Sequence, residues 1–410
     1  MCFALIAAGC GSSGSGGTVT LNWFVATQPG GTIEQVAKDC SKASGGRYTI
    51  DVQLLPTDAS QQREQLVRRL AAKDSTVDLI GMDVIWTGEF ANAGWISPFP
   101  EPEATEVTKD VFPSVVDTAS FEKKVYGAPF NSNTQLLWYR KDLVKKAPET
   151  WDQMIKEADK LASQGKPALI QVQANKYEGF TVWFNALVES AGGTILSGPT
   201  TVSLPEMPTE DALKVMGSLA ASAGAAPNIS TSDEDTARLG FEDGSSAFML
   251  NYTFAYASAE ANAPDVFKNM GFARYPRVVA SKPSKPPLGG FNIGVGAYST
   301  HQDLAFDAAA CIGSDKSELT ATALDGLPPS REHLYTDKVV TKAYPGFSQL
   351  VKESIDAAGP RPLTPAYQDV SLAIQDTLQP PDRIDPSDVT SLYDELKSRL
   401  EDAVNGKGLF

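Results

Sequence analysis

The sequence contains few histidines and no long apolar run. His301 and His333 are the only histidines among 410 residues, and neither belongs to an H-E-x-x-H or similar pattern. No G-x-S-x-G elbow, Walker loop or G-x-G-x-x-G fingerprint occurs, so neither metal nor nucleotide chemistry is indicated and no cofactor is expected. No stretch approaches the roughly 18 to 20 apolar residues that a membrane-spanning helix requires. We therefore expect no transmembrane helix.

Basic residues are also scarce. The chain has 35 Lys and Arg against 50 Asp and Glu, which gives a formal net charge of −15. The basic residues are scattered rather than clustered, which argues against nucleic acid or another polyanion as a partner. The expected ligand is neutral or cationic.

The N-terminus has the features of an exported, lipid-anchored protein. Ala7-Ala8-Gly9-Cys10 follows an apolar start and resembles a bacterial lipobox, and residues 11–17 are all Gly or Ser. We expect residues 1–17 to be a signal remnant, lipobox and flexible leash, with Cys10 as the lipidated residue. Lipid alone would then hold the body on the outer face of the cytoplasmic membrane. The alternative is a disordered N-terminus with a chance cysteine.

The chain has only four cysteines. If Cys2 leaves with the signal segment and Cys10 carries lipid, Cys40 and Cys311 remain. Their spacing is far too long for a C-x-x-C redox motif or a zinc knuckle. Outside the cell a lone pair commonly forms a disulfide, and we favour that interpretation over two buried free thiols.

Hydrophobic periodicity predicts an α/β body. Strands are expected at residues 18–25, 48–55 and 77–83, with helices at 32–42 and 60–72 between them. This alternation is typical of the start of a doubly wound α/β fold. Thr150 and Gln153 form a capping-box pattern before a helix over 151–163, and another helix is expected to open at Thr209. Further strands are predicted at 168–172, 246–250 and 288–295, before a helix-rich tail over 303–404. The length favours two domains.

Several segments, taken together, resemble a known family. They are residues 83–95 (DVIWTGEFANAGW), 126–129 (YGAP), 133–140 (NTQLLWYR), 241–248 (FEDGSSAF), 289–292 (GGFN) and 361–367 (RPLTPAY). The resemblance is to the extracytoplasmic sugar-binding proteins of ABC importers, of the maltose-binding-protein type. It implies a two-lobed periplasmic-binding-protein fold, each lobe a sheet flanked by helices, with a ligand cleft between the lobes. We place lobe 1 at 18–130 plus 298–343 and lobe 2 at 131–297 plus 344–410.

Within that family the segments are most similar to the trehalose-binding lipoproteins of mycobacteria. The resemblance implies a monomeric receptor, not an enzyme, that captures a disaccharide and delivers it to an ABC permease with a cytoplasmic ATPase. Trehalose is the favoured sugar, and the alternative is maltose or another oligosaccharide.

A disaccharide site needs hydrogen-bonding groups for the hydroxyl edges of the sugar. Asp83 ends a predicted strand, where ligands of open α/β sheets gather, although it could instead cap the next helix. Asn133 and Glu242 lie in family-like segments, with turn chemistry and a surface carboxylate as their alternatives. Arg361 stands between two prolines, which stiffen its backbone. We expect its planar guanidinium group to bind the ligand, and the alternative is an exposed loop arginine.

The same site needs apolar platforms for the ring faces. Aromatic side chains in the family-like segments are candidates, although any one of them is more often plain core. Gly290 would let backbone approach the ligand closely. The loop after the first strand lines the cleft by analogy with the family. The aromatic and loop candidates are Trp86, Tyr252, Phe254, Tyr256, Phe291, Thr27 and Gln28.

Two other functions remain open from the sequence. Asp83 and Glu242 are a pair of acids such as a glycoside hydrolase uses. A receptor must release its sugar intact, so its acids should bind hydroxyls rather than flank the glycosidic oxygen. A surface adhesion protein that binds no sugar is the other alternative.

Overall fold

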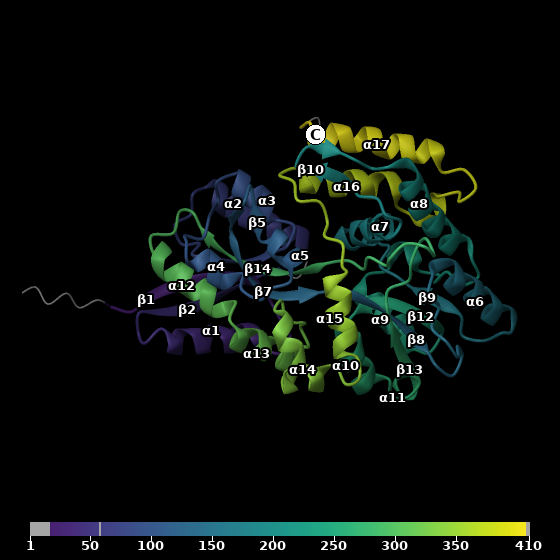
Figure 1. The fold of residues 1–410 in the computed structure, drawn as a ribbon, viewed down its shortest axis with the longest axis horizontal. Helices are drawn as coiled ribbons and strands as arrows, with labels where there is room; N and C mark the ends of the chain where they lie inside the picture. Colours follow the sequence, from purple (N-terminus) through teal and green to yellow (C-terminus); the bar gives the residue numbers. More distant parts are fainter. Residues whose placement is uncertain (1–16, 57–58, 407–410) are drawn as a thin grey trace, which may run out of the picture.

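The computed structural model describes residues 17–56 and 59–406 and has two α/β lobes (Figure 1). Lobe 1, on the left in Figure 1, contains a six-stranded sheet in the order β2-β1-β3-β14-β4, with β7 also paired to β14. β1 is parallel to β2 and β3, whereas β14 is antiparallel to β3 and β7. The strands are β1 (Val19–Ala26), β2 (Tyr48–Leu55), β3 (Leu79–Asp83), β4 (Ile96–Ser97), β7 (Gly127–Asn133) and β14 (Gly289–Gly296).

Helices cover the sheet of lobe 1 because each has one apolar face. Ile33, Val36 and Ala37 on α1 are buried in the same core as Trp23 of β1. A short hairpin, β5 (Ser120–Phe121) and β6 (Lys124–Val125), stands beside α3 and α5. The helices of this lobe are α1 (Thr32–Ala43), α2 (Ala59–Ala71), α3 (Thr87–Asn92), α4 (Glu103–Val107), α5 (Pro113–Thr118), α12 (Gln302–Ile312) and α13 (Asp315–Asp325).

Lobe 2 contains a four-stranded sheet in the order β13-β8-β12-β9. Its strands are β13 (Met270–Ala273), β8 (Gln135–Arg140), β12 (Ser246–Tyr252) and β9 (Leu169–Gln171), and a hairpin is formed by β10 (Leu196–Gly198) and β11 (Thr201–Val202). The helices of lobe 2 and of the tail are α6 (Trp151–Ser163), α7 (Glu178–Ser190), α8 (Glu206–Ala221), α9 (Glu234–Glu242), α10 (Phe254–Asn262), α11 (Pro264–Phe267), α14 (Lys338–Ala343), α15 (Ser348–Asp356), α16 (Tyr367–Leu378) and α17 (Thr390–Val404).

Helix α7 is buried on every side. All residues from Gly179 to Val188 are buried, with α8 and α16 packed against them. A helix that is apolar all round belongs in the interior of a lobe. Its first residue, Glu178, is therefore a carboxylate held at the edge of a core.

The local predictions agree closely with these elements. The strand predicted at 48–55 is β2, and the helix predicted at 151–163 is α6, begun by Thr150, whose Oγ1 accepts a hydrogen bond from the Gln153 amide at 3.2 Å. The helix expected to open at Thr209 instead begins at Glu206. Thr209 Oγ1 donates back to the Pro205 carbonyl at 2.7 Å, a bond typical of a residue inside a helix.

The predicted lobe boundary at residue 297 is wrong. β14 was assigned to lobe 2, but its backbone pairs with β3 and β7 in the sheet of lobe 1. A strand belongs to the sheet whose ladder satisfies its peptide groups. The crossing therefore lies before Gly289. The boundary predicted after residue 130 also falls three residues early, because β7 continues in the lobe 1 sheet to Asn133.

Cys40 and Cys311 are joined in a disulfide, with a Sγ–Sγ distance of 2.07 Å. The bond connects α1 to α12 and confirms the predicted pairing. Cys10 and the leash up to residue 16 lie outside the described residues. Among the helices of the described chain, none has the length and apolar character needed to cross a membrane.

Candidate ligand-binding site

Arg361 lies between two carboxylates that come from different lobes. Its Nη1 donates to Glu178 Oε1 at 2.6 Å, and its Nη2 donates to Asp83 Oδ1 at 3.3 Å. Asp83 ends β3 of lobe 1 and Glu178 begins α7 of lobe 2. The Arg361 side chain is only 5% exposed. One buried guanidinium thus connects the two lobes.

Helix α16 fixes the Glu178 carboxylate. Tyr367 Oη donates to Glu178 Oε1, and Ser371 Oγ donates to Glu178 Oε2 at 2.7 Å. Burial opposes the charge of Arg361, but the surrounding acidic groups outweigh it, so the pKa of Arg361 lies well above its ordinary value. The guanidinium is therefore charged and rigidly oriented.

The same cluster keeps unused hydrogen-bonding capacity. Arg361 Nε is buried and has no partner within the part of the chain that the structure describes. The side chains of Asp83 and Glu178 are 21% and 17% exposed, so each has an edge open to solvent. A buried donor without a partner is uncommon and is satisfied by water or a ligand.

Tyr252, at the end of β12, belongs to this cluster. Burial and then the nearby Glu234 carboxylate raise the pKa of Tyr252, whereas the charge of Arg361 lowers it and Asp83 raises it further. The phenol therefore lies within electrostatic range of the groups that Arg361 connects.

Glu234, at the start of α9, is the second carboxylate of lobe 2 near Tyr252. Its Oε2 accepts a hydrogen bond from Tyr177 Oη at 2.8 Å. Burial raises the pKa of Glu234. The sequence offered no signal for Glu234, because an acid in the first turn of a helix is ordinary.

Asn133 and Phe291 are brought to the edge of the cluster by β14. Phe291 pairs with Asp83 across the sheet, and Asn133, the last residue of β7, pairs with Gly289. Asn133 Oδ1 accepts a hydrogen bond from the amide of the next residue, Thr134, at 3.1 Å.

Gly290 has a structural reason to be glycine. Its φ is +134°, and a Cβ placed there would lie 2.2 Å from the Asn131 carbonyl oxygen. The register of β7 and β14 shifts just after this point, between Phe291 and Asn292. Close approach of two strands, rather than approach to a ligand, accounts for this glycine.

The structure does not bring Glu242 together with Asp83. Glu242 ends α9, accepts from Arg238 Nη1 at 2.8 Å and from Ser258 Oγ at 2.6 Å, and precedes β12. Tyr252 lies at the opposite end of that strand, about 20 Å along it at about 3.3 Å per residue. The acid pair inferred from the sequence is therefore replaced, at this junction, by Asp83 and Glu178.

Two aromatic candidates pack against neighbouring aromatic side chains. Trp86 is 2% exposed and stacks on Phe90, with ring centroids 5.9 Å apart. Tyr256 packs against Phe267 and Phe347, each with ring centroids 5.0 Å away. The Trp86 ring is therefore enclosed in the core and cannot stack on a sugar, whereas Tyr256 is half-buried.

The loop that carries Thr27 and Gln28 meets lobe 2 at the end of α13. The Thr32 amide donates to Asp325 Oδ2 at 3.2 Å, which ties the loop to that helix. The next carbonyl, that of Gly326, accepts from Thr253 Oγ1 of lobe 2 at 3.2 Å. Phe254 follows directly and is half-buried. The end of α13 therefore contacts both the start of α1 and Thr253 of lobe 2.

Sequence analysis missed Glu178, although a signal exists. Glu178 is an acid at the first position of a helix whose next ten residues are mostly apolar and all buried, and such a residue must be partnered or exposed. Two buried amides were also missed: Gln135 Nε2 donates to Gln173 Oε1 at 2.8 Å, next to Tyr252 in the sheet.

A cavity of about 600 Å³ lies between the lobes, bounded by the β5–β6 hairpin, the β10–β11 hairpin and residues 360–363. Of the residues assigned to the cluster above, Arg361 alone lines it. Across residues 17–56 and 59–406, no group of three or more His, Cys, Asp or Glu side chains is placed to hold a metal ion.

Comparison with known proteins assigns the family. Residues 26–318 match the model of the bacterial extracellular solute-binding proteins. The chain belongs to this family. A "probable ABC transporter-binding protein" of Deinococcus radiodurans is 29% identical over 332 residues, which cover 77% of each chain. The diacetylchitobiose binding protein DasA of Streptomyces coelicolor is 23% identical over 337 residues, covering 80% of this solute-binding protein and 76% of DasA.

Solved structures confirm the fold. Maltose-bound MalE3 of T. maritima superposes with a TM-score of 0.82 at 22% identity, covering 93% of this chain and 99% of that one. The GacH receptor of Streptomyces glaucescens superposes with a TM-score of 0.78 at 20% identity, covering 95% and 98%. The family member described here therefore has the expected two-lobed architecture.

Proposed function

We propose that this protein is a non-enzymatic receptor that captures a disaccharide between its lobes and delivers it to an ABC sugar permease driven by a cytoplasmic ATPase. The observation that carries the proposal is Arg361, whose guanidinium joins Asp83 of lobe 1 to Glu178 of lobe 2 and keeps a free Nε–H. Trehalose is the favoured ligand because of the family-like segments in the sequence.

The groups of the cluster suit an uncharged polyhydroxy ligand. Asp83 and Glu178 have open edges that accept hydrogen bonds from hydroxyls, and Arg361 Nε donates one. Because two carboxylates flank the single positive charge of Arg361, the cluster has no excess positive charge to attract an anionic ligand. Contacts to groups of both lobes at once would favour the closed arrangement of the lobes.

The names of the relatives support an oligosaccharide. They include a diacetylchitobiose binding protein and a "maltotriose-binding protein" of Pyrococcus abyssi, the latter 23% identical over 326 residues. They make maltose or another oligosaccharide the second candidate ligand.

Hydrolysis is disfavoured by the hydrogen bonds that the two carboxyl groups make. A glycoside hydrolase requires one protonated carboxyl as general acid beside a second, ionised one. Asp83 and Glu178 instead both accept hydrogen bonds from one guanidinium, and Ser371 also donates to Glu178, so the two carboxyl groups are engaged in holding Arg361.

We further propose that the protein is monomeric and is anchored by lipid at Cys10 on the outer face of the cytoplasmic membrane. Mass spectrometry of the protein from its native membrane tests the anchor, since unmodified Cys10 would contradict it.

Calorimetric titration with trehalose and then with maltose tests the receptor function. Saturable heat with trehalose that maltose does not displace supports the favoured ligand. Heat with maltose alone would support the receptor function but would make maltose, rather than trehalose, the ligand. Absence of binding heat with both sugars, or release of glucose during the titration, would contradict the proposal.

A further inference from the structure

Two consecutive residues at the start of α7 contact two different polar groups of the junction. Glu178 accepts a hydrogen bond from Arg361 Nη1, and Tyr177, the residue before it, donates through its Oη to Glu234 Oε2 at 2.8 Å. Tyr252 lies within electrostatic range of both Glu234 and Arg361. The start of α7 therefore connects the Arg361 cluster with a second carboxylate of lobe 2.

Gly179 makes room for the Tyr177 ring. A Cβ at position 179 would lie 2.2 Å from Tyr177 Oη and 2.3 Å from Tyr177 Cζ, so the ring occupies the space that any other side chain would fill. Glycine is less stable than alanine inside a helix. The position of the Tyr177 ring, folded back over the first turn of α7, accounts for this glycine.

Glu234 depends on Tyr177 for its orientation. Among the described residues, Tyr177 is the one side chain that donates a hydrogen bond to this carboxylate, and no Lys or Arg forms an ion pair with it. Arg238 of the same helix binds Asp235 and Glu242 instead. Glu234 is half-buried, and a carboxylate offers about four acceptor sites, so capacity remains for the hydroxyls of a ligand.

The titratable groups around Glu234 make Tyr177 important for its charge. Burial raises the pKa of Glu234, and Asp233 and Asp235 on the same helix add to the rise, whereas its own amide and the Tyr177 hydroxyl lower the pKa. Burial also raises the pKa of Tyr177 and of Tyr252 on β12, so both phenols stay neutral. Tyr177 therefore favours the ionised carboxylate, which is the form that accepts hydroxyl protons.

We propose that Tyr177 is a positioning residue that orients Glu234 as a hydrogen-bond acceptor for the bound sugar. This rests on the proposed receptor function and adds Glu234 to the ligand-binding groups of lobe 2. Glu178 orients a donor, Arg361, and Tyr177 orients an acceptor, Glu234. The start of one helix thus fixes both groups before the sugar arrives, which lowers the cost of binding.

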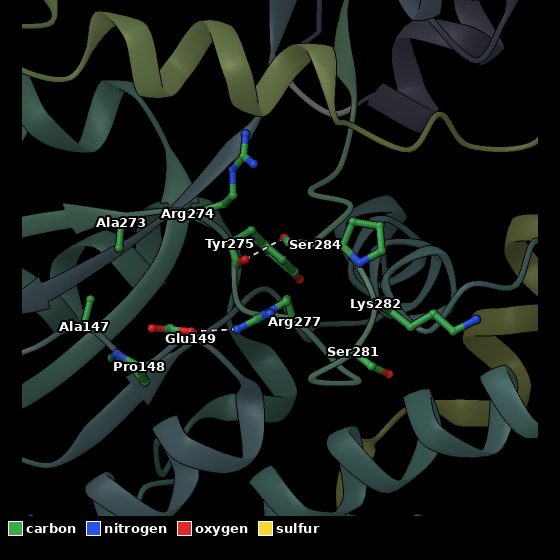
Figure 2. Close-up of a pocket in the computed structure, with 11 residues that line it drawn as sticks. Ala147, Pro148, Glu149, Ala273, Arg274, Tyr275, Arg277, Ser281, Lys282 and Ser284 are labelled. Atoms are coloured by element: carbon green, nitrogen blue, oxygen red, sulfur yellow. Dashed lines mark hydrogen bonds and ion pairs between the residues drawn. The ribbon is translucent and has the colours of Figure 1, made fainter.

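A cavity of about 480 Å³ in lobe 2 is separate from this contact. It is lined by residues at the end of β13 and in the loops after β8 and β13, and Figure 2 shows Glu149 and Arg277 paired within it. Tyr177, Gly179 and Glu234 do not line it. Substitutions at these three positions therefore report on the junction and not on that cavity.

Carboxyl-carbon NMR of the full chain without sugar tests the contact itself. Glu234→Gln identifies the Glu234 signal by its absence. In Tyr177→Phe the pKa of Glu234 should rise by about one unit, because the carboxylate loses a donor while it stays buried. Gly179→Ala displaces the same hydroxyl and should shift the pKa in the same direction. An unchanged pKa in both variants would overturn the proposal.

Calorimetric titration with trehalose and with maltose tests the role in binding. Well above the pKa of Glu234, Tyr177→Phe and Gly179→Ala should each lower the affinity of the bound sugar about tenfold, the effect of one lost hydrogen bond. Wild-type affinity should fall as pH falls through the pKa of Glu234, because a protonated carboxyl accepts fewer hydrogen bonds. In Tyr177→Phe this fall should begin at a higher pH, and in Glu234→Gln it should be absent.

Tyr393→Phe is the matched control. Tyr393 Oη donates to the Leu204 carbonyl at 3.2 Å elsewhere in lobe 2, so its loss should change neither affinity nor the pKa of Glu234. A shifted pKa with unchanged affinity would overturn the role in binding. If the wild type binds neither sugar, the proposed function fails and the role in binding with it, whereas the coupling of Tyr177 to Glu234 would still be seen by NMR.

Discussion

Glu178 and Arg361 are 183 residues apart in the chain and 2.6 Å apart in the structure. Glu178 opens a buried helix of lobe 2, and Arg361 lies on the segment that runs from α15 to α16. Glu178 binds Nη1 of the Arg361 guanidinium, and Nη2 donates to Asp83 of lobe 1. Glu178 is therefore the residue that orients the guanidinium at the lobe junction.

Glu178→Gln should lower sugar affinity by about tenfold, because the ion pair that orients Arg361 becomes a weaker hydrogen bond to an uncharged acceptor. The free energy of unfolding should fall by about 1–3 kcal/mol. Calorimetric titration and urea denaturation measure the two effects. Glu157→Gln, at a partly exposed position of α6 that bonds only to Lys160 on the same helix, is the control and should change neither. Unchanged affinity in Glu178→Gln would contradict the positioning role.

Asp83→Asn and Glu242→Gln should separate the two acids inferred from the sequence. Asp83→Asn removes the lobe 1 partner of Arg361, and we expect affinity to drop by more than about tenfold. Glu242→Gln changes a group bound to Arg238 and Ser258 and should leave affinity unchanged. Equal losses in both variants would show that Glu242 reaches the ligand after all.

Stability should fall as pH rises through neutrality because of Glu318. Burial raises the pKa of Glu318 from 4.5 to about 8, although hydrogen bonds from Ser330 and the charge of Arg331 act in the opposite direction. Between these two values the folded state keeps a proton that the unfolded state has lost, so the free energy of unfolding decreases with pH. Urea midpoints measured across this window should show the slope in the wild type and a weaker slope in Glu318→Gln. Identical slopes would contradict the assignment.

Reduction of the disulfide should destabilise lobe 1. Cys40 and Cys311 close a loop of 271 residues, and the chain-entropy model gives about 4 to 5 kcal/mol or somewhat more for such a loop. The Cys40→Ser/Cys311→Ser double variant should therefore melt earlier than the oxidised wild type. Under dithiothreitol the two should converge, and a difference that persists there would mean that the substitutions act through packing instead.

Gly290→Ala should be costly and Gly289→Ala mild. A Cβ at Gly290 would collide with the Asn131 carbonyl at a φ of +134°, whereas the nearest atom to a Cβ at Gly289 is 3.6 Å away. We expect a loss of about 1–3 kcal/mol for Gly290→Ala, the usual cost of a residue forced into a disfavoured conformation. Chemical denaturation measures it. Equal stability of the two variants would refute the explanation given for this glycine.

Most of the local structure could be predicted from the sequence. The strand at 48–55 and the helix at 151–163 have the predicted bounds, because a period of two and a period of 3.6 apolar residues distinguish strands from helices, and Thr150 marks a helix start. The predicted Cys40–Cys311 pairing also holds. The family-like segments predicted the two-lobed architecture that the solved structures confirm.

Only the tertiary structure decided which polar groups meet. In the sequence Glu242 and Glu178 are both acids at helix ends, yet one pairs with Arg238 on its own helix and the other with Arg361 of a distant segment. The sequence made Trp86 a candidate to stack on a sugar ring, but in the structure it is packed in the core and only 2% exposed. Periodicity reports which face of an element is buried, but not which other element covers it. The chain therefore determined its elements and its family, whereas packing between distant segments determined the lobe assignment of β14 and the residues around Arg361.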